Sequence, residues 1–307
     1  MPYLVQKVIK GKKYFYLVSA AKISGKAKQF QFYLGAKKPG AKEIERYSKV
    51  LKQRVESFLA SKDPLLTIIS EEDLSKIEAA KKIYGKILKQ SPSARKNYYE
   101  WFITTYTYDS NAIEGSTLSL RETAMVLFEG ISPQGKSMKD VIAAENHKKA
   151  FDFLLSYKGD ITKQLILKLH KILTAKILNP PESGKLRKVQ VYVSGAEEIP
   201  PKPRDVEPQL SALLKWHKAN KKKYHPVVVA AYFHSAFELI HPFIDFNGRT
   251  GRLLLNFILM KNKYPPIDIR NKEKLGYYSA IRASVKGNIK PLAELVIKYL
   301  KEIAERV

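Results

Sequence analysis

A twelve-residue stretch, 241–252 (HPFIDFNGRTGR), constrains the fold more than any other part of the 307-residue chain. The apolar run Val227–Ile240 before it predicts a buried helix. Because Pro242 disfavours helical geometry at the residue before it, this helix should end near His241. Leucine, phenylalanine and isoleucine recur at helical spacing after the stretch, and Asn247 is a residue type favoured at helix N-caps. The sequence therefore predicts a tight loop between two packed helices.

The polar side chains of this loop suit a phosphate chain. The first backbone amides of a helix have no intrahelical partner and carry partial positive charge, so an anion binds there readily. Arg249 and Arg252 are three residues apart and would lie on nearly the same helix face. Asp245 offers a hard oxygen ligand for Mg²⁺, and the imidazole of His241 titrates near neutrality. Each residue alone is typical of an ordinary turn or solvated face, but together they indicate a phosphate site.

Taken in order, these residues resemble the signature of the Fic family, H-x-F-x-[DE]-[GA]-N-[GK]-R-x-x-R. Phe243 fits the aromatic position of the signature and has no chemical role there. Phe246 departs from it, because it stands where the family has Gly or Ala. A ring at this position either crowds the α-phosphate of a nucleotide or points into the core, and both alternatives stay open. The resemblance covers residues 95–305 and leaves residues 1–90 unexplained.

A second motif lies ahead of the signature, at Ser110–Gly115 (SNAIEG). It resembles the inhibitory pattern [ST]-x-x-x-E-[GN] of Fic proteins that carry an inhibitory helix before the catalytic core. The resemblance implies that Glu114, in the motif that Ser110 begins, pairs with Arg252. Such a pair removes the arginine from the γ-phosphate by electrostatic competition, so ATP binds in an unproductive pose.

Fic enzymes mostly transfer AMP from ATP to a Ser, Thr or Tyr hydroxyl of a protein. The resemblance implies a protein adenylyltransferase in which His241 is the general base and Asp245 holds Mg²⁺ on the phosphates. The residues implied in nucleotide binding are Asn247, Gly248, Arg249, Arg252, Tyr277 and Tyr278. The target protein is unknown, and the chain itself is one alternative. Removal of AMP, use of another nucleotide and transfer of phosphate are further alternatives.

The segment before the signature resembles the β-hairpin flap of Fic proteins. Gly184–Arg187 leads into alternating valines, and Pro200 and Pro201 follow. An exposed strand edge here would pair with an extended segment of the target. The alternative is an ordinary hairpin packed on the core. The valines expected to dock the target are Val189, Val191 and Val193.

Composition restricts the class of protein further. The chain has no cysteine, which excludes disulfides and thiol catalysis, and its six histidines form no metal motif. We see no apolar run of membrane-spanning length and no signal peptide, and therefore expect a soluble, cytoplasmic protein without a membrane partner. The sequence leaves open whether the chain forms a homo-oligomer. Helical periodicity predicts a mainly α fold, with helices at 44–58, 70–88, 94–111, 120–128, 141–155, 163–176, 206–218, 274–285 and 292–305.

The first forty residues differ from the rest in pattern and charge. They contain nine lysines and no acid, within a chain of net charge +26. Alternation predicts three antiparallel strands, Tyr3–Ile9, Tyr14–Lys22 and Ala27–Leu34. Such a sheet would bind nucleic acid, dock an acidic target protein, or be a solvated cap. A nucleic-acid-binding regulator with a Fic core as nucleotide sensor is thus the second function considered. The expected parts are a basic three-stranded module at 1–40, a helical linker at 41–93 and a Fic domain at 94–305.

Overall fold

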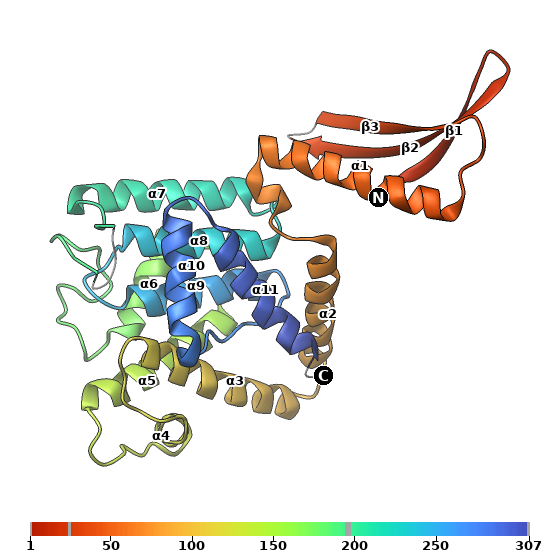
Figure 1. Ribbon diagram of the computed structural model, residues 1–307. Helices are drawn as coiled ribbons and strands as arrows, with labels where there is room; N and C mark the ends of the chain where they lie inside the picture. The colour runs from red at the N-terminus through yellow and green to blue at the C-terminus, as the bar shows by residue number, and fades with distance from the viewer. Residues whose placement is uncertain (1, 24–25, 194–197, 306–307) are drawn as a thin grey trace. The chain divides into compact units, whose positions relative to one another are not determined.

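The amino-terminal sheet expected from the alternating residues is present. The computed structural model describes residues 2–23, 26–193 and 198–305. Three strands form an antiparallel sheet in chain order (Figure 1). Each predicted strand is confirmed and lies within the observed bounds, which are β1 (Tyr3–Ile9), β2 (Lys12–Ile23) and β3 (Lys26–Gly35).

Helix α1 (Ala41–Lys62) covers one face of this sheet. The ring of Phe30 packs edge-on against Phe58 with centroids 5.2 Å apart, and Phe32 lies 4.6 Å from Tyr47. A three-stranded sheet needs such a partner, because by itself it buries too little apolar surface to be stable. Sheet and helix together form the first compact unit, Met1–Ser70, so the limit expected at residue 40 falls inside it.

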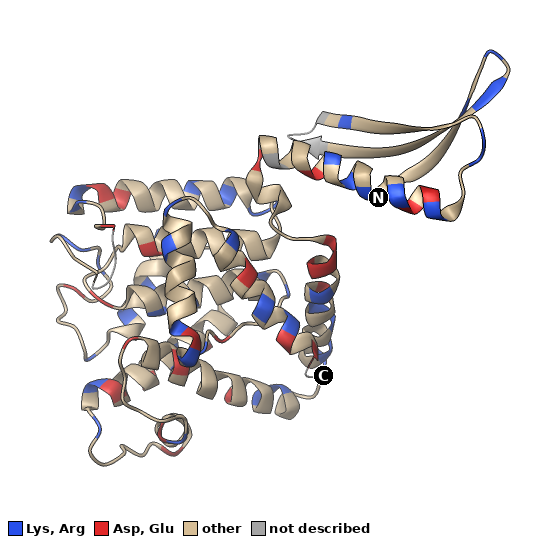
Figure 2. Cartoon of the chain, viewed as in Figure 1, with Lys and Arg blue, Asp and Glu red and all other residues tan. Residues whose placement is uncertain are grey.

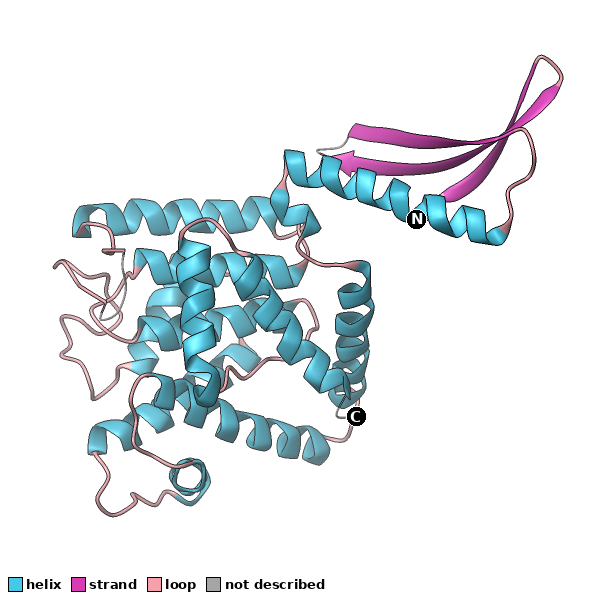
Figure 3. Cartoon of the chain, in the orientation of Figure 1, coloured by secondary structure: helices cyan, strands magenta, loops and turns pink. Residues whose placement is uncertain are grey.

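The second compact unit, Glu71–Val307, contains helices and loops in its described residues (Figure 3). The limit expected at residue 93 falls inside this unit. Its α-helices in the described residues are α2 (Glu71–Leu88), α3 (Pro92–Ile113), α4 (Leu120–Ala124), α5 (Met138–Ser156), α6 (Lys163–Leu173), α7 (Pro203–Asn220), α8 (Pro226–Ile240), α9 (Asn247–Lys261), α10 (Lys274–Val285) and α11 (Lys290–Glu305). The mainly helical fold predicted from the sequence is confirmed. A π-helical turn, Met125–Glu129, continues α4 to the end of the predicted helix.

Helices α8 and α9 form the centre of this unit and pack against each other. Helices α7, α10 and α11 contact α8, while α3, α5 and α6 contact α9. Such a position requires apolar side chains all round a helix. The run 227–231 (VVVAA) of α8 and the run 253–259 (LLLNFIL) of α9 are accordingly fully buried. The loop that joins the two helices is therefore fixed at both ends by the core.

The hairpin expected over Val189–Gly195 is not formed by the described residues, and Ser194 and Gly195 lie outside them. Side chains bind the carbonyls that a strand ladder would use. Arg187 donates from Nη1 to the oxygen of Val189 at 3.0 Å and from Nη2 to that of Pro201, and Gln190 donates from Nε2 to that of Pro200 at 2.9 Å. Both prolines lack an N–H for a ladder. The segment is thus a loop held by side chains.

No helix in the described ranges is both long and apolar enough to cross a lipid bilayer.

Candidate active site

His241 ends helix α8, as the sequence predicts, and adopts the left-handed conformation with φ 47°. Its Nδ1 lies 3.3 Å from the carbonyl oxygen of Glu238, a geometry in which Nδ1–H donates and Nε2 keeps its lone pair. Burial lowers the pKa of His241, so the imidazole is neutral at pH 7. A neutral imidazole of this tautomer is able to accept a proton at Nε2.

Asn247 does not cap helix α9, which corrects the prediction. It is the first residue of the helix, and Phe246 occupies the N-cap position with no side-chain cap bond. The Asn247 side chain instead closes the preceding loop, because Oδ1 accepts from the amide of Phe243 and Nδ2 donates to its carbonyl, both at 2.9 Å. The side chain is thereby satisfied within the loop. The first amides of α9 are left without a side-chain cap, as an anion site requires.

Phe246 is buried, with 2% of its surface exposed, and the guanidinium carbon of Arg249 lies 3.5 Å from its ring centroid. Of the two alternatives for this ring, packing into the core is the observed one. The backbone of Phe246 is left-handed at φ 64°, which costs a non-glycine residue about 1–2 kcal/mol. A small residue would suit this conformation better, and the stacked Arg249 offsets part of the cost.

Arg252 is fully inside the protein and forms an ion pair with Glu114 at the end of α3. Arg252 Nη2 lies 2.7 Å from Glu114 Oε1, and Nε and Nη2 also donate to the hydroxyl and carbonyl of Ser110 at 3.0 and 2.9 Å. Burial raises the pKa of Glu114, but the charges of Arg252 and Arg249 outweigh it and lower the pKa below its ordinary value. The pair is therefore charged on both sides.

Gly248 makes room for this pair. A Cβ at Gly248 would collide with Glu114 Oε1 and lie 2.9 Å from Arg252 Nη1. The absence of a side chain in the first turn of α9 thus permits the close approach of the carboxylate. This geometry links the signature loop to the motif at Ser110–Gly115, which is more than 120 residues away in the sequence.

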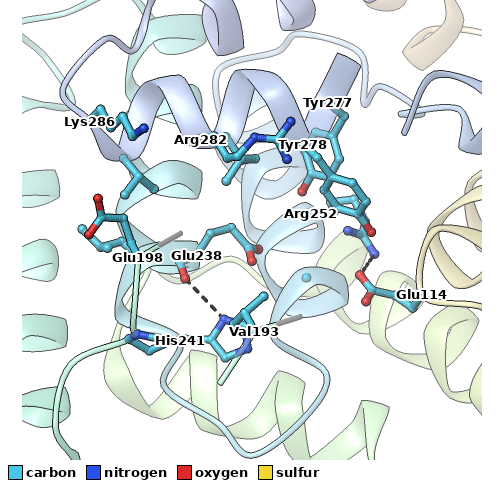
Figure 4. A pocket seen from close by; sticks show the side chains of 15 residues that line it. Glu114, Val193, Glu198, Glu238, His241, Arg252, Tyr277, Tyr278, Arg282 and Lys286 are labelled. Carbon is cyan, nitrogen blue, oxygen red and sulfur yellow. Dashed lines mark hydrogen bonds and ion pairs between the residues drawn. The ribbon is translucent and has the colours of Figure 1, made fainter. Parts of the chain in front are cut away.

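A cavity of about 440 Å³ joins these groups (Figure 4). Its lining contains the predicted site residues Glu114, Val193, His241, Gly248, Arg252, Tyr277 and Tyr278. Asp245 and Arg249 are not among the lining residues; Arg249 Nη2 is 3.6 Å from Asp245 Oδ1, and Nη1 donates to Asn111 Oδ1 at 3.3 Å. The structure thus brings the imidazole, the arginine and the glutamate to one cavity, and places Asp245 beside it.

Glu238 also lines this cavity, and the sequence prediction missed it. Its Oε1 lies 3.8 Å from Nδ1 of His234, and neither atom has a hydrogen-bond partner among the described residues. Burial raises the pKa of Glu238 to about 8 and lowers that of His234 to about 3. His234 Nε2 and the hydroxyl of Tyr277 are 2.7 Å apart. The available signal was a pair of polar residues at i,i+4 in the otherwise apolar helix α8.

A histidine at a helix exit, a buried arginine and the uncapped N-terminus of α9 thus form an arrangement suited to an anion such as a phosphate. Residues 160–259 match the family model described as Fic/DOC family. Over 232 residues the chain is 32% identical to Protein adenylyltransferase Fic of Drosophila persimilis and 31% identical to that of Drosophila melanogaster. These alignments cover 74% of this chain. The chain therefore contains a domain of the Fic/DOC family.

Solved structures show the same fold. Fic-1 from C. elegans superposes with a TM-score of 0.67 at 28% identity, over 87% of this chain and 76% of that one. A Fic domain containing signaling protein from Bacteroides thetaiotaomicron gives 0.68 at 23% identity, over 75% of this chain and 95% of that one. The chain spans slightly under half the length of the curated Drosophila relatives, 45–46%.

Proposed function

We propose that this chain is a protein adenylyltransferase that transfers AMP from ATP to a Ser, Thr or Tyr hydroxyl of a target protein. In the resting state Glu114 restrains it. The observation that carries the proposal is a single cavity lined by both His241 and the Glu114–Arg252 pair. The names of the Drosophila relatives support the activity.

The chemistry follows from the positions of the side chains. His241 Nε2 takes the proton of the target hydroxyl, whose oxygen forms a bond to the α-phosphorus of ATP. The bond between that phosphorus and the pyrophosphate breaks, and pyrophosphate leaves. Amides at the start of α9, at Asn247 and Gly248, stabilise the charge on the phosphates. General-base assistance of this kind contributes about 10²–10⁴-fold to the rate.

Asp245 fits a role in holding Mg²⁺. Its side chain is 44% exposed, and Oδ1 accepts the amide of Phe246 at 2.6 Å, which fixes the carboxylate. Mg²⁺ in nucleotide sites is commonly bound by one or two carboxylates together with phosphate oxygens, so a single aspartate suffices. When bound, the ion would neutralise charge on the phosphates of ATP.

Restraint follows from the occupation of Arg252. The Arg252 guanidinium donates two hydrogen bonds to Ser110, and its Nη2 also lies 2.7 Å from Glu114 Oε1. A γ-phosphate is an anion that would bind the same guanidinium, so it competes with the Glu114 carboxylate.

Removal of AMP from a modified target is the second candidate function. It is favoured by the position of the Glu114 carboxylate in the cavity that contains His241.

Target docking is proposed for the loop before the signature. Tyr192 is 77% exposed and Val189 55% exposed, and Val193 reaches the cavity. Val191 lies between them and is half-buried. Because Arg187 and Gln190 hold this loop from behind, an extended target segment would meet a fixed surface beside His241.

The test is intact-mass analysis of wild-type protein and Glu114→Gly after incubation with MgATP. We expect the variant to gain the mass of AMP on itself or on an added target, and the wild type to gain little. Glu114→Gln is the matched control, because it removes the charge and keeps the size. His241→Ala in the Glu114→Gly background should abolish the gain. A gain of phosphate mass, or equal gains in wild type and variant, would refute the proposal.

A further inference from the structure

The unit Met1–Ser70 carries a strongly basic sheet whose face opposite α1 is uncovered within that unit. Residues 1–70 contain 15 Lys and Arg against 4 Asp and Glu, and all four acids follow residue 40. Glu43, Glu45 and Glu56 lie on α1 and Asp63 follows it, so the sheet itself has none (Figure 2). The acidic residues of this unit are therefore confined to α1 and Asp63, and the charged side chains of the sheet are all basic.

The strand register defines which side chains share the uncovered face. Phe30 and Phe32 of β3 face α1, so Gln29, Gln31 and Tyr33 lie on the opposite side. Tyr33 lies across from Tyr16 of β2, which in turn lies across from β1. The face thus combines amide, phenol and ammonium groups with the apolar side chains of Val5, Ile9 and Val18, and its lysines among the described side chains are Lys7 and Lys12. Its other polar side chains are Tyr3 on β1, Tyr14 and Tyr16 on β2, and Gln29, Gln31 and Tyr33 on β3.

Contacts across this face confirm the arrangement. Lys7 Nζ lies 4.7 Å from the ring centroid of Tyr16 and donates to Gln31 Oε1 at 3.2 Å, which spans all three strands. The rings of Tyr16 and Tyr33 are 5.3 Å apart. Lys7, Gln29 and Gln31 are nevertheless exposed, and Tyr33 has 53% of its surface exposed. These polar side chains thus hold one another in position through mutual contacts and are still exposed to solvent.

We propose that this sheet face binds duplex DNA in the major groove. Its charge complements the phosphates, and lysine and tyrosine side chains are common phosphate contacts. Glutamine is suited to the edge of adenine, which it reads through two hydrogen bonds. Three strands at spacings of about 4.8 Å are about 10 Å across, which fits a groove about 12 Å wide. The major groove of duplex RNA is too narrow to admit a sheet.

The test uses the full chain and a fluorescent random-sequence DNA duplex, with affinity measured over a range of salt concentrations. The variant pair Lys7→Glu and Lys12→Glu reverses charge on the sheet face. The pair Lys42→Glu and Arg54→Glu makes the same change of charge on exposed positions of α1 and is the matched control. We expect the sheet pair to weaken binding about tenfold or more and to reduce the salt slope by about one per lost phosphate contact. The control pair should change binding less than twofold.

Two further measurements sharpen the result. Circular dichroism checks that the sheet pair is folded, and Lys7→Gln with Lys12→Gln gives a milder change at the same positions. Gln29→Ala with Gln31→Ala should reduce discrimination among DNA sequences and leave the salt slope unchanged. Absence of DNA binding, equal losses in the sheet and α1 pairs, or equal affinity for duplex RNA or a polyglutamate peptide would overturn the proposal.

Discussion

Two acidic side chains face the same cavity and carry different charges. Glu114 approaches from the end of α3 and contacts Arg252 at 2.7 Å, and its pKa is lowered because the arginine charges outweigh burial. Glu238 approaches from α8, and burial raises its pKa to about 8. At pH 7 the first is a carboxylate and the second a neutral acid.

The nearest cation, more than depth in the protein, therefore determines the charge of an acidic side chain in this cavity. The Glu238 side chain is 14% exposed and that of Glu114 is 29% exposed, so both are largely withdrawn from water. One buried guanidinium stabilises one neighbouring anion, and the negative charge of Glu114 further raises the pKa of Glu238. Only the charged acid competes with a phosphate.

The largest expected effect comes from removing the shared cation. Arg252→Met should lower the free energy of unfolding by about 3–5 kcal/mol, because it leaves Glu114 charged and unpaired in a low-dielectric site. Urea unfolding of the variant at pH 7 measures the loss. Arg252→Met combined with Glu114→Gln should regain a large part of it. Equal stability of the single and double variants would show that the ion pair does not couple these residues.

A smaller effect is expected from crowding the pair. Gly248→Ala places a methyl group against Glu114 Oε1, so it should cost about 1–3 kcal/mol of unfolding free energy, as overpacking commonly does. In the Glu114→Gly background the same substitution should cost much less. A double-mutant cycle measured by thermal unfolding gives the coupling. Additive effects of the two substitutions on the unfolding free energy would contradict the close approach of Glu114 to Gly248.

The smallest effect at pH 7 is expected from Glu238→Gln, because the acid that it replaces is already neutral. Its influence lies in the pH dependence. The pKa of Glu238 is raised on folding from 4.5 to about 8, so its contribution to stability is fully present below pH 4.5 and is lost as the pH rises through 8. Glu238→Gln should remove this loss, as urea unfolding from pH 5 to pH 9 would show. An unchanged pH profile would mean that Glu238 is charged in the folded protein.

Glu114 should show the opposite dependence. Its pKa is lowered on folding, so the stability that it contributes is present above pH 4.5 and is lost as the pH falls through its folded-state pKa. Glu114→Gln should therefore flatten the acid limb of the unfolding profile, where Glu238→Gln has no effect. If Glu114→Gln instead changed stability at alkaline pH, the charges assigned to Glu114 and Glu238 would be wrong.

Local sequence patterns predicted the elements and the loop well. Pro242 correctly indicated the helix end at His241, and alternation located the three strands. These features depend on residues close together in the sequence. The pattern around Ser110–Gly115 placed Glu114 against Arg252 only through a family resemblance, because neither spacing nor periodicity links residues so far apart.

Features that depend on tertiary contacts were not predictable in this way. Asn247 looked like an N-cap, but the loop folds back so that its amide meets the backbone of Phe243. The protonation of Glu238 depends on burial among helices, which a one-dimensional pattern does not report. In the described part of the segment, a loop takes the place of the expected hairpin because Arg187 and Gln190 bind its carbonyls.

Competition between Glu114 and the γ-phosphate for Arg252 is tested most directly by nucleotide affinity. Isothermal titration of wild type and Glu114→Gln with MgATP and with MgADP separates the γ-phosphate from the rest of the nucleotide. We expect the substitution to tighten ATP binding about tenfold or more relative to ADP, as for a charge-assisted contact of about 1.5–3 kcal/mol. Equal changes for ATP and ADP, or no change for either, would contradict it.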